Sequence, residues 1–329
     1  MSDESVIEDP PEEPSPTAKR GRIAAGRERV EHQITSTYQR LEEARPSSGP
    51  IDTAFRAFER DTASGGGVLS AAVAFRVFLF LVPYVFFCVV TFGFASHASS
   101  ESPTEVAKSV GVSGLMARTF ASAANLSGWH RAWAMCISGF AVYLATRALL
   151  KVLRITHGLI WRIAVPKLSS TIKPVGVIIG LVTAQFVVGA GIAWLRSLSP
   201  ISAIVALVLS AALSFGIWMI SSRMLPHAEC PWWALAPGAA LVAIGTTGLQ
   251  AGTIFYFAGS IERKSDIYGA IGTSLVLLLW AYILGRIVIA AISLNAAFWY
   301  RSEERAGRAV PEPIDLEEQL AGHPPEPSV

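Results

Sequence analysis

Charged residues are scarce in this sequence, and acidic ones are missing from its apolar stretches. Only 16% of the 329 residues are charged, whereas 52% are hydrophobic. Of the 25 Asp and Glu residues, 13 precede Thr62 and seven follow Arg301. The other five fall between apolar stretches: Glu101, Glu105, Glu229, Glu262 and Asp266. A soluble domain of this length is far less apolar. The composition therefore predicts a polytopic membrane protein, and it argues against a proton relay built on buried carboxylates.

Residues that hold metals or form disulfides are equally sparse. The three cysteines, Cys88, Cys136 and Cys230, have no paired spacing and are best interpreted as small apolar residues. The six histidines are scattered without a His-x-His pair, so the pattern indicates neither a zinc site nor a metallonuclease centre. We expect no metal, no cofactor and no catalytic residue, and hence no enzyme. The net charge of +2 gives no support to nucleic-acid binding.

Six apolar stretches are long enough to cross a bilayer, which needs about 20 residues of α-helix. They cover residues 68–95, 132–150, 174–195, 201–225, 232–257 and 268–299. The predicted fold is therefore all-α, with six transmembrane helices forming a membrane domain over residues 51–300. An even number of spans places both termini on the same side of the membrane.

The distribution of Lys and Arg predicts which side that is. Segments on the side of the termini carry eleven cations: Arg56, Arg60, Lys151, Arg154, Arg162, Lys167, Lys173, Arg223, Arg301, Arg305 and Arg308. The opposite side carries six: Lys108, Arg118, Arg131, Arg196, Arg263 and Lys264. Cationic loops are retained in the cytoplasm. Both termini are therefore predicted to be cytoplasmic, in a multi-pass protein of the inner, or plasma, membrane.

The parts outside the spans have distinct compositions. Residues 1–50 and 301–329 are predicted to be disordered cytoplasmic tails, because they are rich in polar residues and proline and cannot bury enough apolar surface. After residue 50, Asp52 can cap a short interfacial helix with Phe55 and Phe58 on one face, followed by a glycine hinge at residues 65–67. Between the first two spans, residues 96–131 predict an external amphipathic segment that begins with a capping box at Ser102.

Three arginines, Arg76, Arg147 and Arg286, lie within the predicted spans, where a cation costs a few kcal/mol or more unless it is hydrated, paired or near the surface. Arg147 is close to the cytoplasmic end of its predicted span, so its side chain is expected to reach the headgroups. Arg76 lies deeper, so that snorkelling to the surface is possible but strained, and a functional or internal packing role is equally open. Arg286 shares a helical face with Tyr282 and Ser293, a polar stripe expected to face protein or water.

Because the spans hold no acid, we expect no intramembrane carboxylate partner for these arginines. A guanidinium matches phosphate or carboxylate with a planar fork of donors, so the sequence predicts an anionic substrate bound by Arg76, Tyr282, Arg286 and Ser293. The other interpretation of Arg286 is that its long span brings it nearer the inner interface than its position suggests.

Several short blocks are similar to the YihY/BrkB family of bacterial inner-membrane proteins over about residues 51–300. The resembling blocks are Ala71–Phe75 followed by Pro83, Pro237–Ala239, Tyr268–Gly272, Leu278–Trp280, Tyr282 and Leu294–Ala296. The resemblance implies six transmembrane helices with both termini in the cytoplasm. Members have been described as virulence or serum-resistance factors, and the family was once assigned a tRNA-processing ribonuclease activity.

The sequence also departs from this family. Phe75 stands where Tyr is usual, Phe80 where Ser is common, and Ser293 where Glu commonly precedes the Leu-Asn pair. Arg76 and Arg286 occupy positions expected to be uncharged. If that Glu couples ion movement in relatives, this chain lacks the coupling residue, because Ser293 replaces it.

Two functions of different classes follow. The first is a transporter or lipid-handling protein of the cell envelope that acts on an anionic lipid or organic anion. The alternative is a non-transporting scaffold or regulator of an envelope complex, with membrane lipids as its surroundings. A ribonuclease is a distant third, because the chain offers neither metal ligands nor a basic face for RNA.

Overall fold

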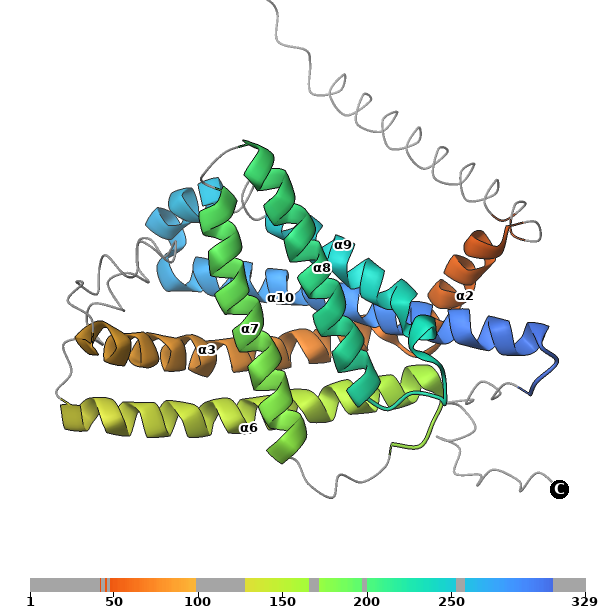
Figure 1. Ribbon diagram of the computed structural model, residues 1–329, viewed down its shortest axis with the longest axis horizontal. Helices are drawn as coiled ribbons and strands as arrows, with labels where there is room; N and C mark the ends of the chain where they lie inside the picture. Colours follow the sequence, from red (N-terminus) through yellow and green to blue (C-terminus); the bar gives the residue numbers. More distant parts are fainter. Residues whose placement is uncertain are drawn as a thin grey trace, which may run out of the picture. The chain divides into compact units, whose positions relative to one another are not determined.

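The structure, a computed structural model, describes residues 42, 45, 48–98, 128–165, 172–196, 200–252 and 258–309. Regular structure in these residues is entirely helical, as predicted (Figure 1). The helices are α2 (Gly49–Ala63), α3 (Gly66–Ala98), α6 (Gly128–Trp161), α7 (Ile172–Arg196), α8 (Pro200–Met224), the short 3-10 helix η1 (Trp232–Leu235), α9 (Ala236–Gly252) and α10 (Ala258–Arg305).

Five helical stretches are long and apolar enough to cross a membrane. They are Gly66–Cys88, Ala132–Trp161, Ile204–Met224, Trp232–Leu249 and Leu275–Arg305. The sixth predicted span, 174–195, falls in α7, whose apolar stretch Lys173–Gln185 is shorter. A multi-pass helical membrane protein is thus the fold, and the number of six spans stays a prediction.

Helix α6 is longer than the sequence analysis predicted. The predicted span ended at residue 150, but α6 continues to Trp161, where Arg162 adopts a left-handed φ of 53°. The backbone N–H of Ile163 then donates to the Gly158 carbonyl at 3.0 Å, and that of Arg162 to the Leu159 carbonyl at 3.3 Å. This pair of bonds is the Schellman helix ending, here formed without glycine at the left-handed position.

Several predicted boundaries outside the spans also change. Helix α2 begins at Gly49, three residues before the predicted cap Asp52. Helix α10 continues through residues 301–305, which were assigned to the C-terminal tail, and ends at a left-handed Gly307. Most of the predicted tails, 1–50 and 301–329, and of the external segment 96–131 lies outside the described residues.

The chain divides into two compact units, residues 1–55 and 56–329. In the first, the Arg45 Nε donates to the Asp52 carboxylate at 3.0 Å, and the guanidinium lies 5.4 Å from the centre of the Phe55 ring. The second unit holds every candidate span. In it, each α-helix from α3 onward packs against the next α-helix along the chain, and α10 also packs against α3 and α6.

Helix α10 approaches two other helices closely. At Gly285, a Cβ atom would collide with the carbonyl oxygen of Ser70, so α10 and α3 meet backbone to backbone. Ten residues later, the buried Asn295 side chain accepts a hydrogen bond from the backbone N–H of Gly238 at 2.6 Å. Because Gly238 lies in the first turn of α9, this bond pairs one of the amides that a helix start leaves unsatisfied. Both contacts hold α10 within the bundle.

We expect Asn295→Ala to destabilise the protein by about 1–3 kcal/mol, because it leaves the buried Gly238 N–H without a partner. Ser302→Ala on the same helix is the matched control. It removes a 2.7 Å bond from a half-buried hydroxyl to the Trp299 carbonyl, so its effect should be small. Thermal unfolding of the detergent-solubilised protein measures both variants. Equal midpoints for Asn295→Ala and the unsubstituted protein would contradict the assigned role of this bond.

Candidate functional site

The connection between α2 and α3 is a tight turn that brings an acid to the start of the first span. Only Ser64 and Gly65 separate the two helices, and Gly65 has a left-handed φ of 67°. At Gly66 a Cβ atom would collide with the carboxylate of Asp61. The predicted glycine hinge is therefore a turn that needs glycine at both positions, and it lays Asp61, only 7% exposed, against the first turn of α3.

Arg286 binds this acid. Its Nη2 lies 3.0 Å from Asp61 Oδ2, and its Nη1 lies 3.4 Å from Asp61 Oδ1 and 3.4 Å from the Ser70 hydroxyl. Two parallel donors on one carboxylate form the fork geometry that makes arginine pairs specific. The sequence analysis expected no acid within the spans to pair with Arg286, and the acid that binds it indeed comes from α2, before the first span; this partner was not predicted.

The same contacts place the guanidinium of Arg286 at the level of the first turn of α3. Ser70 lies four residues after the start of α3 at Gly66, and Gly285 packs against the Ser70 carbonyl. Four residues of helix correspond to about 6 Å. This position agrees with the interpretation in which Arg286 lies near the membrane surface, where headgroups and water also reach.

A second arginine of α2 lies where α6 ends. Arg60 is 9% exposed, donates from Nη1 to the Ile160 carbonyl at 2.8 Å, and has its guanidinium carbon 4.6 Å from the centre of the Tyr300 ring. Tyr300 in turn donates its hydroxyl to the Trp161 carbonyl at 2.7 Å. Burial, together with the nearby charge of Arg162, lowers the pKa of Arg60 to about 10. Arg60 thus caps the carboxyl end of α6, where a cation also meets the helix dipole favourably.

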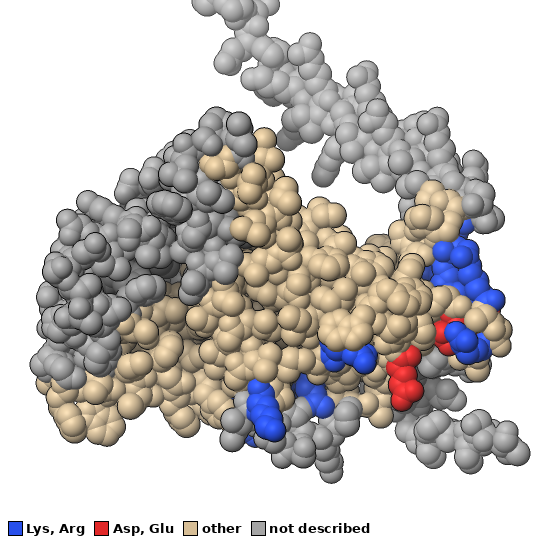
Figure 2. All heavy atoms as spheres, viewed as in Figure 1, with Lys and Arg blue, Asp and Glu red and all other residues tan. Residues whose placement is uncertain are grey.

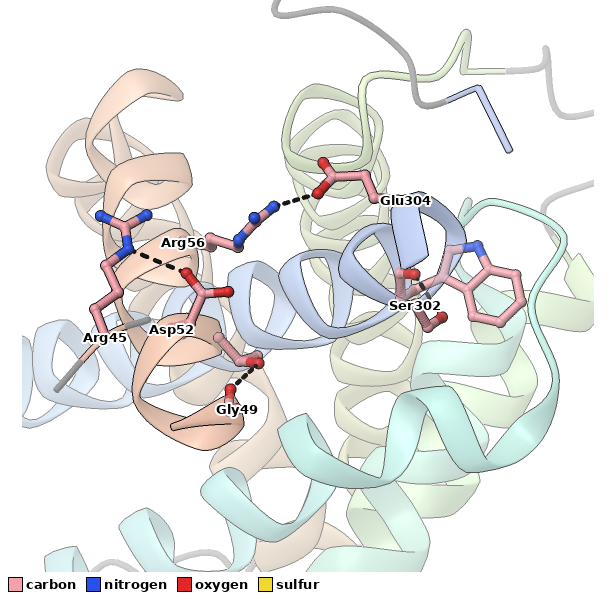
Figure 3. A network of polar contacts seen from close by, with 8 residues as sticks. Arg45, Gly49, Asp52, Arg56, Ser302 and Glu304 are labelled. Carbon is pink, nitrogen blue, oxygen red and sulfur yellow. Dashed lines mark hydrogen bonds and ion pairs between the residues drawn. The ribbon is translucent and has the colours of Figure 1, made fainter. Parts of the chain in front are cut away.

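An exposed ion pair lies one turn before Arg60 on α2. The Arg56 Nη1 lies 2.6 Å from the Glu304 carboxylate near the end of α10 (Figure 3). Arg56, Arg60 and Asp61 therefore hold the second half of α2 to α10 and to the end of α6.

The three residues of the predicted polar stripe on α10 lie in different surroundings. Tyr282 is 39% exposed and makes no hydrogen bond to the described residues. Arg286 is half-buried and paired with Asp61. Ser293 is fully buried, and within the described part of the chain its hydroxyl has no hydrogen-bond partner. The helical spacing thus places three polar residues on one face but in three different environments.

Arg76 lies apart from this group. It is half-buried on α3, ten residues or about 15 Å beyond Gly66, between the exposed side chains of Phe75 and Leu79. Arg76 makes no hydrogen bond or ion pair to any residue that the structure describes. Of the four predicted site residues, Arg76 is therefore the cation that stays open to an external anion.

Arg147 does not lie near the end of its helix. The apolar stretch of α6 runs from Ala132 to Trp161, and Arg147 lies near its middle. Leu149, two residues further, packs in one cluster with Phe80 and Tyr84 of α3. Lys151 and Arg154 suggested the end of the helix, whereas it continues to Trp161; whether the Arg147 side chain reaches the headgroups stays a prediction.

A family model described as virulence factor BrkB matches residues 55–314. The chain belongs to this family. No curated protein and no solved structure matches the chain. The match confirms the resemblance drawn from the sequence blocks, and the structure joins two of them, because the BrkB-like Pro237–Ala239 and Leu294–Ala296 blocks meet in the bond between Gly238 and Asn295.

In this BrkB family chain, sequence reasoning missed the partners of the site rather than its cations. Asp61, Ser70 and Tyr300 were assigned no role, and Arg60 was counted only among the cations that predict the orientation. One available signal was that Asp61 is the last acid before the first span, only five residues before Gly66. The pairing itself joins residues 225 positions apart, which no local pattern indicates.

Breaking the ion pair of Asp61 and Arg286 should destabilise the protein by about 2 kcal/mol. This value is at the lower end for a buried pair because the Arg286 side chain stays 36% exposed. Asp61→Asn and Arg286→Gln test it singly, and the exchange Asp61→Arg with Arg286→Asp should recover part of the loss. Thermal unfolding in detergent is the measurement.

The exposed pair of Arg56 and Glu304 provides the matched control. Its side chains are 36% and 44% exposed, so Arg56→Gln should shift stability by less than about 1 kcal/mol. Equal effects of Arg56→Gln and Arg286→Gln would argue against a special role for the pair with Asp61.

Proposed function

We propose that this protein is a transporter or lipid-handling protein of the cell envelope that acts on a substrate carrying a phosphate or another anionic group. The observation that carries the proposal is Arg76, a half-buried cation about 15 Å along the first span without a described partner. An arginine in that position needs an anion or water to offset its desolvation. The phosphate of a membrane lipid is the anion that a bilayer itself offers.

The other three predicted residues contribute in different ways. Arg286 already holds Asp61, so an incoming anion must compete with that carboxylate for the guanidinium. Tyr282, one turn away, presents an exposed side chain whose hydroxyl can donate to the same anion. Ser293 adds a buried hydroxyl without a described partner, further along the helix. In this proposal Arg76 makes the first contact, and the α10 residues receive the anion after Asp61 is displaced.

We further propose that the protein lies in the inner membrane with both termini in the cytoplasm. The support is the excess of cations in the segments on the side of the termini, including Arg162 after α6, Lys173 in the first turn of α7, and Arg305 and Arg308 around the end of α10. The proposal assigns no catalytic residue, no metal and no nucleic acid.

A scaffold or regulator is the second candidate, and one observation favours it. Arg60 binds the Ile160 carbonyl at the end of α6, and Arg286 is paired with Asp61, so two of the cations near the bundle serve to hold its helices together. A protein whose arginines all act in this way needs no anionic substrate. Arg76 is the residue that separates the two functions.

Arg76→Gln should change the lipid composition of the envelope in the same direction as deletion of the gene, because it removes the unpaired cation. Arg76→Lys keeps the charge but loses the planar fork, so its effect should be smaller. Untargeted comparison of envelope lipids between deletion, unsubstituted and variant cells measures this. Arg286→Gln and Arg286→Lys extend the comparison to the pair with Asp61.

Arg305→Gln serves as the control, because Arg305 is an exposed cation in the last turn of α10, outside the proposed site. Unaltered lipids in the deletion strain would reject lipid handling and favour the scaffold. If the deletion changes the lipids but both Arg76 variants behave like the unsubstituted protein, Arg76 is not the binding residue.

A further inference from the structure

One face of α6 carries cations where a membrane helix normally presents apolar side chains to lipid. The exposed large residues of this helix recur every three or four positions and include Phe140, Leu144, Ile155 and Leu159. Arg147 and Lys151 fall within this same series, between Leu144 and Ile155, and both are exposed. Residues on other faces of this part of the helix, such as Thr146 and Leu150, are buried in the protein.

Arg154 extends the row. Together Arg147, Lys151 and Arg154 are spaced by four and three residues, so they follow one side of α6 over about 10 Å. We name these three residues the basic stripe. On the face of the molecule in Figure 2, most of the described surface carries no charged side chain.

The stripe reaches far along the helix. Arg147 precedes Trp161, the last residue of α6, by 14 residues, which corresponds to about 21 Å. On the neighbouring helix, Phe80 shares a cluster with Leu149 and lies 14 residues after the start of α3. Arg147 thus lies well inside both α6 and the pair of helices α3 and α6, far from the ends of either helix.

Within the described residues, Arg147 and Lys151 make no hydrogen bond or ion pair. Four described acids bind arginines on other elements: Asp52 binds Arg45, Asp61 binds Arg286, Glu303 binds Arg308 and Glu304 binds Arg56. The exposed charges of Arg147 and Lys151 are therefore directed outward.

We propose that the basic stripe of α6 binds the phosphate headgroup of an anionic phospholipid and guides it from the inner end of the helix toward Arg147. This proposal rests on the lipid-handling function proposed above and gives it a substrate class and a second binding surface. Arginine can hold a phosphate with two donors, and a lysine one turn away adds a mobile point charge.

The apolar neighbours of the stripe favour a lipid over a free anion. Leu144 on one side and Ile155 on the other are 45% and 42% exposed, so a bound molecule meets cations and apolar surface together. A phospholipid satisfies both, with its phosphate on the stripe and its acyl chains along the flanking residues. Inorganic phosphate would satisfy only the charge. Basic surfaces near the cytoplasmic ends of membrane helices bind anionic headgroups by the same electrostatics.

The test compares a stripe variant with a charge-matched control in the full-length purified protein. Arg147→Gln with Lys151→Gln removes two cations from the stripe. Lys173→Gln with Arg305→Gln removes two exposed cations from the first turn of α7 and the last turn of α10. Phosphatidylglycerol and phosphatidylcholine are titrated into each protein in a non-ionic detergent, and native mass spectrometry measures the bound lipid. Inorganic phosphate is added as a competitor.

The unsubstituted protein and the control should retain phosphatidylglycerol in preference to phosphatidylcholine, and the stripe variant should bind phosphatidylglycerol about tenfold or more weakly. Arg147→Lys should fall between them. Size-exclusion chromatography checks that each variant is folded. The proposal is overturned if the stripe variant binds as tightly as the control, or if inorganic phosphate displaces the lipid at equal concentration. It is also overturned if a folded stripe variant instead loses self-association, which would assign the stripe to a second copy of the chain.

A second readout separates this proposal from the proposed function. The same proteins are reconstituted in vesicles, and the movement of a fluorescent phosphatidylglycerol between leaflets is followed by chemical quenching. Specific binding without lipid movement, lost in the stripe variant, supports the stripe and counts against transport. Lipid movement that is equal in the stripe variant and the control supports the function and rejects the stripe.

Discussion

The ion pair between Asp61 and Arg286 is the constraint on which the entry to the membrane domain depends. Helix α10 carries a cation between long apolar segments, and a carboxylate offsets its desolvation only if it is brought close in the right geometry. The turn at Gly65 and Gly66 brings it there, because a side chain at Gly66 would occupy the position of the carboxylate. The turn between α2 and α3 and the positive charge on α10 therefore depend on each other.

From that pair, the other contacts at the same end of the bundle follow along α10. The helix meets α3 at Gly285, α9 at Asn295, and the end of α6 through Tyr300, each contact one to three turns after the last. Two of these contacts use groups that helix ends leave unsatisfied: the Gly238 amide at the start of α9 and the Trp161 carbonyl at the end of α6. Side chains of the long last helix thus form hydrogen bonds with backbone groups that the ends of its shorter neighbours leave unsatisfied.

Five candidate spans could be located from the sequence because their signal is local: apolar composition over about 20 residues is a property of each segment alone. The end of α6 could not. Lys151 and Arg154 indicate a surface, yet the helix continues because its other side buries residues such as Ile160 and Trp161. The role of Asp61 was equally hidden, since it depends on contact with a residue 225 positions away. The four candidate residues were chosen by helical spacing, which identifies a shared face but not whether lipid, protein or another charge covers it.

The described cations of the membrane domain fall into two groups with different consequences. Arg60 and Arg286 contact carbonyl or carboxylate groups of the protein, so their charge is used in holding α2, α6 and α10 together. Arg76, Arg147 and Lys151 have no such partner in the described residues, although α3 and α6 pack directly against each other. Each cation left in hydrocarbon without a partner opposes folding by a few kcal/mol, and two or three of them equal a large share of a domain's net stability. If these cations bind lipid phosphate as proposed, that penalty is removed, and the stability of the protein then depends on the anionic lipid around it.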